Sequence, residues 1–521
     1  MIEKNIIGFS VSNKEDSYTQ GYNPKTGKPL TGNFSNANYE EINLAVEKAT
    51  EAFEEYRNIS GKKKALFLNA IADEIENLGE ILIERCCKES GLPNARIIGE
   101  RGRTLGQLRM FAELVLEGSW LEAIIETADL EREPIPKPDI RRMLVPIGPV
   151  VVFAASNFPL AFSTAGGDTA SALAGGNPVI VKAHSAHPGT SALVGSAIME
   201  AAQKTNMPDG VFSLLHGSGK VVGQSLISHS GVKAAGFTGS QKAGRILFDL
   251  ANQRKDPIPF FAEMGSVNPV LLLPNSLNTK TAEMLSNSIT MGAGQFCTNP
   301  GLLITLENDL LEQFIIDLVS ALEEINPSVM LTEKICKSYY NDLDLSLSNQ
   351  DVKVESKLTD NNGLNNAASV LVSVTGESFL KNPNLADEVF GPYSMIVKCK
   401  NEDEVNDVLS SLNGQLTGTV FGSKEEIHSF TKSIHTLEKR VGRLIFNGVP
   451  TGVEVSSSMQ HGGPYPASSD SRFTSVGTMA IKRFVRPIAF QSWPQNELPD
   501  ELKNDNPLNI WRLMNGDWTK D

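Results

Sequence analysis

The run Val150-Val-Val-Phe-Ala-Ala-Ser-Asn-Phe-Pro159 decides the fold class, because β-branched apolar residues give way abruptly to small and polar ones. A continuous apolar run of this kind is typical of a strand buried on both faces of a parallel sheet. Similar runs lie at 179–181, 211–215 and 232–237, separated by small-residue stretches with helical spacing. We therefore expect a doubly wound α/β domain, whose ligands bind beyond the carboxyl ends of its strands.

Amphipathic helices are expected ahead of this sheet. Apolar side chains recur at steps of three and four over residues 39–58 and again over 68–82, and the second helix is expected to end near Gly91. A further helix is expected over 100–116. Residues 121–142 combine prolines with dense charge, which predicts an arm outside the main core.

A second region of alternating helices and strands extends from 270 to about 446. We expect helices at 309–325 and 402–412, and strands at 394–397 and 418–421. The chain therefore contains a second α/β unit.

The composition excludes several classes of protein. With 521 residues, 40% apolar and 21% charged, the chain has the length of several domains and the balance of a globular protein. The 47 basic and 61 acidic residues give a formal charge of −14, which repels nucleic acid and anionic lipid. The longest apolar run, 144–155, is interrupted by proline and glycine and is too short to span a membrane. We expect neither nucleic acid nor membrane as a partner.

The cysteines and the amino terminus indicate the compartment. The five cysteines are odd in number and scattered, which argues against a disulfide framework and for a reducing environment. Residues 1–10 contain no apolar stretch typical of a secretory signal. We expect a cytoplasmic protein.

The segment Met291-Gly-Ala-Gly-Gln-Phe-Cys-Thr-Asn-Pro300 contains a candidate nucleophile, Cys297. Backbone amides of small neighbouring residues can stabilise its thiolate, although a lone cysteine is more often a small buried hydrophobe. Glu263 follows the apolar run 260–262, and such surroundings would raise its pKa into the range of a general base. Capping or ion pairing is the alternative for this glutamate.

Two further motifs carry side chains suited to binding. Asn157 lies just beyond an expected core strand, where its amide could donate to a developing oxyanion or simply form a turn. The segment Asp387-Glu-Val-Phe-Gly-Pro-Tyr393 joins an acid and an aromatic residue to a Gly-Pro turn, and a structural turn is again the alternative.

Together these four motifs resemble the aldehyde dehydrogenase superfamily in residue type, order and spacing, including the separation of 297 − 263 = 34 residues. The resemblance covers about residues 40–490. Further segments that resemble the family lie at 146–149, 175–182, 236–240 and 444–448.

The resemblance implies a thiol mechanism. The Cys297 thiolate would attack the aldehyde carbon, and the Asn157 amide with the Cys297 backbone N–H would hold the oxyanion. After hydride transfer to a nicotinamide, water activated by Glu263 would hydrolyse the thioester. An acid at position 263 favours hydrolysis over transfer to coenzyme A.

The resemblance also implies a dinucleotide cofactor without the usual glycine fingerprint. Its diphosphate would rest at the amino end of the helix after the Gly236-Phe-Thr-Gly-Ser240 turn, and the residues concerned are Gly236, Thr238, Gly239 and Ser240. Lys182 resembles a lysine that contacts the adenine ribose. NAD-preferring relatives usually carry glutamate where this chain has Ser185, and Lys220 would add positive charge, so we expect NADP, with NAD also accepted.

Other residues match the family's cofactor contacts. Glu388 and Phe390 resemble residues that bond the nicotinamide ribose and pack the ring. His184 is expected to line the adenosine site. It forms an HxxH pair with His187, but a third ligand at suitable spacing is missing, so we expect no metal.

Within the superfamily, segments 153–168, 182–188 and 462–470 resemble 2-oxoglutarate semialdehyde (2,5-dioxopentanoate) dehydrogenases, and an NADP-linked fatty aldehyde dehydrogenase shares much of the pattern. A keto-acid substrate needs a cation for its carboxylate, whereas a fatty tail needs an apolar tunnel. Arg103 is the candidate clamp and Arg472 a second, with a solvated side chain as the alternative for Arg103. The expected pocket walls are Phe158, Met291, Phe296, Thr298 and Phe473.

The expected organisation follows from the resemblance. It comprises a cofactor-binding domain at 1–122 and 145–262, an arm at 123–144, a catalytic domain at 263–476, and arm plus tail at 477–521. Pairing of the arm across subunits implies a homodimer or homotetramer. A catalytically silent relative is the remaining alternative, and the joint presence of Cys297, Glu263 and Asn157 argues against it.

Overall fold

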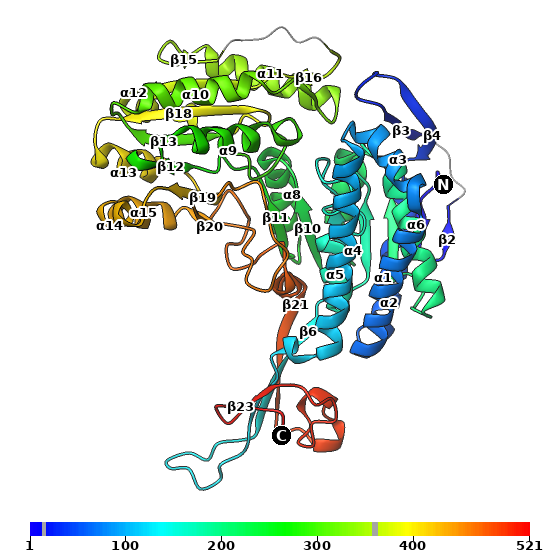
Figure 1. Cartoon of the computed structure of the whole chain (residues 1–521). Coiled ribbons are helices and arrows are strands. Elements are labelled where there is room, and N and C mark those ends of the chain that lie inside the picture. The colour runs from blue at the N-terminus through cyan, green and yellow to red at the C-terminus, as the bar shows by residue number, and fades with distance from the viewer. Residues whose placement is uncertain (13–16, 357–362) are drawn as a thin grey trace.

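The computed structural model describes residues 1–12, 17–356 and 363–521, which form two α/β bodies and a projecting arm (Figure 1). The first body contains a seven-stranded sheet in the order β11-β10-β7-β8-β9-β1-β2. Its strands are β7 (Val150–Phe153), β8 (Val179–Lys182), β9 (Phe212–Leu215), β10 (Ala234–Thr238), β11 (Phe260–Glu263), β1 (Ile6–Ile7) and β2 (Ser10–Val11). The five strands from β7 to β11 pair in parallel, which confirms the expected doubly wound sheet.

Both faces of this sheet are covered, because successive residues of a strand point to opposite sides. Val150 and Val152 belong to one apolar cluster, whereas Val151 and Phe153 belong to another. The first face packs against α2 (Gly61–Asn77), α3 (Gly79–Ser90), α4 (Asn94–Glu117), α5 (Gly167–Ala174) and α6 (Pro188–Lys204). The second packs against α1 (Tyr39–Tyr56), α7 (Gln224–Ser228) and α8 (Gln241–Gln253).

The helix expected over residues 68–82 and onward to Gly91 is two helices, so that prediction was wrong. Helix α2 ends at Asn77 and α3 begins at Gly79, whose φ of +53° departs from helical geometry. A residue with Cβ rarely adopts this conformation, and glycine does so readily. The apolar periodicity continues across the break, which is why it suggested a single helix.

The second body contains a sheet in the order β15-β17-β18-β13-β12-β19-β20. Its strands are β12 (Val270–Leu272), β13 (Leu302–Leu306), β15 (Lys353–Val354), β17 (Val370–Thr375), β18 (Tyr393–Cys399), β19 (Gln415–Phe421) and β20 (Val441–Phe446). Only β15 pairs antiparallel among these described strands. The larger helices beside it are α9 (Thr279–Thr290), α10 (Leu311–Glu323), α11 (Glu333–Leu347), α13 (Glu402–Ser411) and α15 (Thr431–Glu438).

The arm extends away from both bodies and carries the carboxyl terminus (Figure 1). It is a five-stranded sheet in the order β21-β6-β5-β22-β23. Its strands are β5 (Ile124–Glu126), β6 (Ile140–Pro146), β21 (Val485–Gln491), β22 (Arg512–Met514) and β23 (Asp517–Thr519). Because β22 pairs with β5, the polar tail, which suggested no role in the sequence, completes the arm's sheet.

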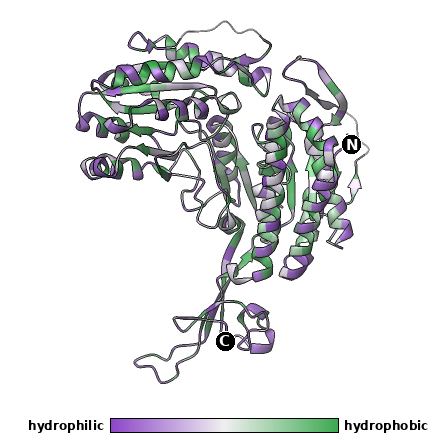
Figure 2. Ribbon diagram, viewed as in Figure 1, coloured by the Kyte–Doolittle hydropathy of each residue, from purple (hydrophilic) through white to green (hydrophobic). Residues whose placement is uncertain are grey.

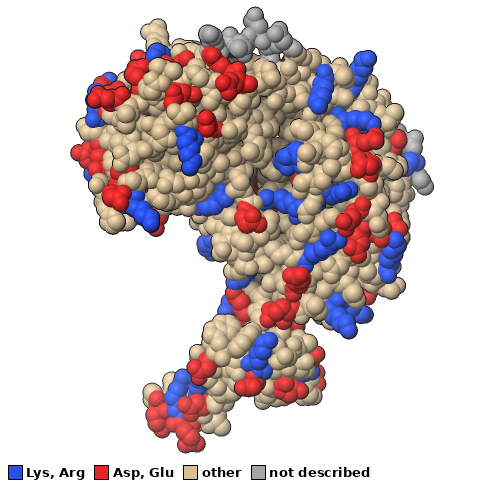
Figure 3. Space-filling view, viewed as in Figure 1, with Lys and Arg blue, Asp and Glu red and all other residues tan. Residues whose placement is uncertain are grey.

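Hydrophobic residues concentrate on the strands and on the inward sides of the helices (Figure 2). None of the helices in the described residues is long and apolar enough to cross a bilayer. On the face shown in Figure 3 the surface is hollowed between the two bodies, with basic side chains near the rim.

Candidate active site

The segment that carries Cys297 follows a short 3-10 turn, Met291–Gly294, and has an unusual backbone. Gly292, Ala293 and Gly294 all have φ between +56° and +66°. A Cβ on Gly294 would lie 2.2 Å from the carbonyl carbon of Gly391. Glycine is therefore required at 294 both by its backbone conformation and by the close approach of the neighbouring loop.

Cys297 lies in a cluster with Glu263 and a residue that the sequence did not suggest, His461. The Sγ atom of Cys297 is 3.6 Å from His461 Nε2, and the same nitrogen is 2.9 Å from Glu263 Oε1. His461 and Glu263 are 1% and 3% exposed, whereas Cys297 is half-buried. The thiol can therefore be reached from outside while its two partners are enclosed.

Hydrogen bonds with Thr474 and Ser475 fix the positions of Glu263 and His461. Glu263 ends β11 and Ser475 Oγ donates to its Oε2 at 2.5 Å. His461 N–H donates to Thr474 Oγ1, and its carbonyl accepts from Ser475 N–H. Ser475 thus contacts both partners.

The ionisation of the cluster differs from the sequence-based expectation. Burial and the adjacent Glu263 carboxylate raise the pKa of the Cys297 thiol. The pKa of Glu263 lies below its ordinary value. Burial is the largest single influence and acts to raise this pKa, but contacts with His461, Ser475 and Cys297 together outweigh it. The expectation of a raised Glu263 pKa was wrong, because apolar strand neighbours in the sequence do not reveal polar partners that come from distant loops.

Asn157 and Asn268 hold the backbone on either side of Cys297. Asn157 Nδ2 donates to the carbonyl of Gln295 at 3.0 Å, so the structure brings this amide to the Cys297 segment. Asn268 Nδ2 donates to the carbonyls of Cys297 and Asn299, each at 2.9 Å. Asn268 was not singled out in the sequence, although the positive φ that it adopts is one that asparagine tolerates.

Aromatic rings and an arginine line the approach to this segment. Phe158 and Phe296 meet edge to face with ring centroids 5.2 Å apart, and Phe162 lies 6.1 Å from the His461 ring. The Arg96 guanidinium stacks over Phe158 at 4.5 Å and over Phe296 at 5.4 Å. Two of the expected wall residues, Phe158 and Phe296, are therefore in contact.

Arg103 lies on the same helix as Arg96 and is half-buried. Its Nη1 donates to the Val453 carbonyl at 2.5 Å, and its guanidinium carbon lies 5.7 Å from the centre of the Phe162 ring. Within the described residues, Nε and Nη2 of Arg103 are buried without a hydrogen-bond partner. Burial lowers the pKa of this guanidinium, whereas Glu100 and Cys297 raise it. Two donors of this guanidinium are thus left without a partner among the described residues.

Arg472 has a different environment. Its side chain is 79% exposed and pairs with both oxygens of Asp470. This surface pair already engages the guanidinium, which weakens its attraction for a substrate carboxylate, and the role of Arg472 as a second clamp stays a prediction.

The remaining expected wall residues are spread over different environments. Met291 is 44% exposed at the start of the 3-10 turn. Thr298 is buried, and its Oγ1 has no hydrogen-bond partner in the described parts of the chain. Phe473 packs its ring 5.2 Å from that of Phe261.

The turn expected to receive a diphosphate lies directly beside Glu263. Thr238 pairs with Glu263 across β10 and β11, and Gly239 N–H donates to the Glu263 carbonyl at 3.1 Å. Ser240 caps α8 by accepting from Ala243 N–H, and Gly239 and Ser240 are exposed. A Cβ on Gly236 would lie 2.8 Å from Asp168 Oδ2, so the role of this glycine in the structure is close packing.

The residues expected to contact the adenosine part of the cofactor include two lysines, Lys182 and Lys220. Lys182 is 7% exposed at the end of β8, and burial lowers its pKa to about 8. Ser185 and Lys220 are exposed, and His184 stacks on His187 with ring centroids 5.4 Å apart. His187 Nε2 lies 2.9 Å from the Ala155 carbonyl, which gives the HxxH pair a structural role.

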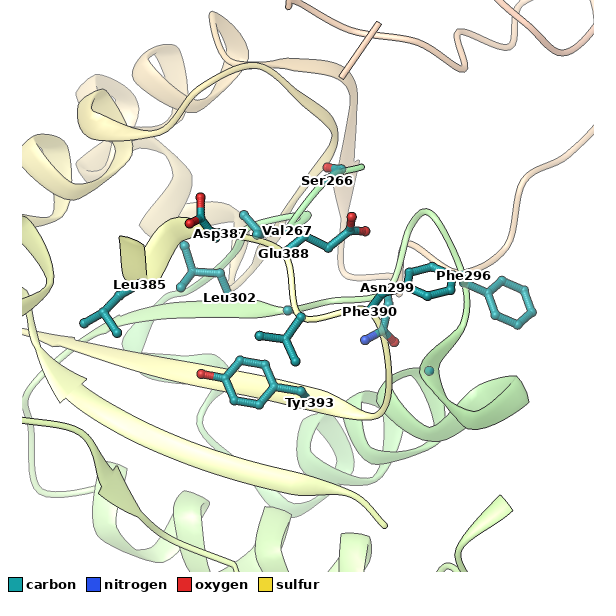
Figure 4. A pocket seen from close by; sticks show the side chains of 13 residues that line it. Ser266, Val267, Phe296, Asn299, Leu302, Leu385, Asp387, Glu388, Phe390 and Tyr393 are labelled. Atoms are coloured by element: carbon teal, nitrogen blue, oxygen red, sulfur yellow. The ribbon is translucent and has the colours of Figure 1, made fainter. Parts of the chain in front are cut away.

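A pocket between the Cys297 segment and the loop before β18 is lined by both remaining candidates, Glu388 and Phe390. Figure 4 shows the Glu388 carboxylate extending toward Ser266, with Phe390 and Phe296 beyond it. Burial raises the pKa of Glu388 to about 7, while a hydrogen bond from the Ser266 backbone lowers it. Close to neutral pH this carboxyl is therefore partly protonated, so it can either donate to or accept from a ligand hydroxyl.

Sequence reasoning missed His461 because it lies 164 residues from Cys297 along the chain. The available signal was a histidine directly before Gly462-Gly463-Pro464, in a segment already singled out by resemblance. Arg96 was missed because one arginine on an amphipathic helix is usually solvated.

Comparisons with known proteins agree with this geometry. Residues 11–480 match the family described as the aldehyde dehydrogenase family. The chain is 48% identical over 519 residues to alpha-ketoglutaric semialdehyde dehydrogenase 2 of Azospirillum brasilense, covering 98% of both chains. It is 45% identical over 487 residues to alpha-ketoglutaric semialdehyde dehydrogenase of Acinetobacter baylyi, covering 93% of this chain and 92% of that one.

A solved structure shows the same fold at lower identity. It is a 1-pyrroline-5-carboxylate dehydrogenase from Thermus with bound NAD, with a TM-score of 0.78 and 20% identity. The match covers 94% of this chain and 92% of that one.

Proposed function

Because the chain belongs to the aldehyde dehydrogenase family, we propose that it oxidises 2-oxoglutarate semialdehyde to 2-oxoglutarate through a thioester on Cys297, with NADP as the hydride acceptor. The observation that carries this proposal is the nearly full-length match to two proteins named for that substrate. The family uses a nicotinamide dinucleotide. The preference for NADP and the roles of individual residues are parts of the proposal.

The cluster of Cys297, His461 and Glu263 supports the thiol chemistry. Cys297 Sγ lies 3.6 Å from His461 Nε2, which lies 2.9 Å from the Glu263 carboxylate, so the thiol proton can leave toward the His461–Glu263 pair. The thiolate then attacks the aldehyde carbon. The Cys297 N–H and the Asn157 amide would hold the oxyanion, which requires the amide to leave the Gln295 carbonyl.

The second half of the reaction requires a water molecule beside the thioester. Glu263 has a lowered pKa and is therefore ionised near neutral pH, so it can accept a proton from that water. Ser475 holds the other carboxylate oxygen and fixes its orientation.

The residues around the expected cofactor fit a dinucleotide. Gly239 and Ser240 are exposed at the amino end of α8, where the helix dipole favours a diphosphate. Glu388 and Phe390 face the pocket beside the Cys297 segment. Bound there, the nicotinamide would supply the hydride acceptor.

The preference for NADP is supported by charge. Lys182 and Lys220 are cationic, and the exposed Ser185 places no carboxylate where a 2′-phosphate would lie. A measured ratio of kcat/KM for NADP over NAD above one supports this part of the proposal, and a ratio below one overturns it.

The keto-acid end of the substrate requires a cation, and the unpartnered donors of Arg103 provide one. Arg96 adds positive charge above the Phe158 and Phe296 rings. The same rings favour the second candidate, a medium- or long-chain aldehyde, because they form an apolar wall.

One comparison of reaction rates distinguishes the two candidate substrates. We expect kcat/KM for 2-oxoglutarate semialdehyde to exceed that for hexanal and longer aldehydes by at least about tenfold, since a charged pair is worth about 1.5–3 kcal/mol. Formation of reduced cofactor measures both rates. A higher value for the long aldehydes would select the second candidate, and no reduction with any aldehyde would indicate a silent relative.

The domain division and the oligomer are also proposed. The three largest sheets in the described residues support a cofactor-binding domain (1–122 and 145–262), a catalytic domain (263–476) and an arm with tail (123–144 and 477–521). The edge strand β20 exposes Leu444 and Phe446 by 43% and 44%, which supports its burial in a homodimer or homotetramer. Light scattering that shows a monomer at micromolar concentration would contradict this.

A further inference from the structure

The cluster at the centre of the molecule presents a thiol sulfur, an imidazole nitrogen and a carboxylate oxygen, all within 4.8 Å of one another. In a tetrahedral zinc site, Zn–S of about 2.3 Å and Zn–N of about 2.0–2.1 Å place the sulfur and nitrogen about 3.5 Å apart. The observed separation of Cys297 Sγ and His461 Nε2 is 3.6 Å. These two donors already have the spacing that a zinc ion requires.

The third donor needs only a small movement. Nitrogen and oxygen ligands of tetrahedral zinc lie about 3.3 Å apart. His461 Nε2 and Glu263 Oε1 are 2.9 Å apart, so these two atoms need to separate by only a few tenths of an ångström, and the carboxylate oxygen lies within 4.8 Å of Cys297 Sγ. Ser475 already holds Oε2, which leaves Oε1 to coordinate alone.

We propose that Glu263, Cys297 and His461 reversibly capture a thiophilic divalent cation such as Zn²⁺, and that capture inhibits the enzyme. On binding, the Cys297 thiol forms a bond to the metal and releases its proton to solvent. Cys297 is half-buried, so this residue is not fully enclosed. Inhibition rests on the proposed function, in which all three groups must be free to react, whereas binding rests on the geometry alone.

The surroundings favour reversible capture over a permanent metal centre. The protein supplies three ligands and leaves the fourth position open, as in sites that exchange ligands. A metal-binding histidine usually donates its other ring nitrogen to a partner, and loss of that partner weakens binding about 10–100-fold. Among the described residues, His461 Nδ1 is buried without such a partner.

Direct binding is measured on the full-length enzyme without aldehyde. Co²⁺ is the spectroscopic probe, because coordination by a thiolate produces a charge-transfer band, and Zn²⁺ is titrated by calorimetry and by displacement of Co²⁺. We expect one ion per chain, loss of the band in Cys297→Ser, and at least tenfold weaker zinc binding in His461→Gln. Mg²⁺, which prefers oxygen ligands, should neither bind there nor inhibit.

Cys87→Ser is the matched control, because Cys87 is a half-buried free cysteine outside the cluster. It should bind Zn²⁺ as the unaltered enzyme does. Retained thermal melting temperature and cofactor binding establish that the cluster variants are folded, and Glu263→Gln provides a third variant in which zinc affinity should fall.

The readouts separate this inference from the proposed function. A cobalt–thiolate band with zinc inhibition that a chelator reverses supports the whole proposal. A band in an enzyme that oxidises no aldehyde supports the metal site while the proposed function fails. An active enzyme without the band, or zinc affinity unchanged in all three cluster variants, overturns the inference.

Discussion

The reacting cluster and the expected cofactor side differ in how firmly their side chains are held. Glu263 and His461 are almost fully buried, and each has contacts that fix its position. Gly239, Ser240, Ser185 and Lys220 are exposed. The proposed chemistry would thus depend on buried groups that influence one another's ionisation, whereas the proposed cofactor preference would depend on solvated charges.

This difference has an energetic consequence. Removing one partner of a buried charged group leaves the other unpaired, which costs several kcal/mol. An exposed charge is screened by water, and changing it alters binding by about 1 kcal/mol. Substitutions in the two regions should therefore have effects of very different size.

The largest effect is expected for Cys297→Ala. Without the sulfur nucleophile no thioester forms, so kcat should fall by at least about four orders of magnitude. Cofactor binding, followed by calorimetry, should be retained because the α8 terminus is untouched. Substantial residual oxidation would remove Cys297 from the mechanism.

Glu263→Gln tests the coupling within the cluster. The carboxylate raises the pKa of the Cys297 thiol, so its removal should shift the pH dependence of iodoacetamide alkylation toward lower pH. Hydrolysis should slow by about 10²–10⁴-fold, because the general base is lost. An unchanged alkylation profile would contradict the coupling, whatever happens to turnover.

Substitutions of Arg103 and Arg472 should have smaller effects than those in the cluster, and the two arginines should differ from each other. Arg103→Ala should lower kcat/KM for 2-oxoglutarate semialdehyde by about 10–100-fold, mainly through KM, because a charge-assisted hydrogen bond is lost. Hexanal should be affected much less. Arg472→Ala is the matched control and should leave both substrates nearly unchanged, since its guanidinium is exposed and paired with Asp470. Equal losses for the two substrates in Arg103→Ala would exclude a carboxylate clamp.

The smallest effect is expected at Ser185, which is exposed on the expected cofactor side. Ser185→Glu should reduce kcat/KM for NADP about tenfold, because a carboxylate repels the 2′-phosphate, and should change that for NAD much less. Ser185→Gln has the same length without the charge and serves as the control. If both variants lose NADP activity equally, bulk and not charge is responsible.

Much of the fold could be predicted locally. Apolar runs placed β7, β8 and β10 to within about two residues, because a strand buried on both faces must be continuously apolar. The break at Gly79 was not visible, since the apolar periodicity runs through it. The pairing of the tail strand β22 with β5 could not be predicted either, because strand pairing joins residues that are distant in sequence.

The sequence by itself determined the family and the parallel sheets and singled out Cys297 and Glu263 as candidates, because these depend on residue types at short spacings. Only the tertiary structure brought His461 between them, placed unpartnered donors on Arg103 and exposed Arg472. It also reversed the expected direction of the Glu263 pKa shift. The physical reason is that electrostatic and hydrogen-bonding partners act through space over a few ångströms, and no local pattern records which distant loop supplies them.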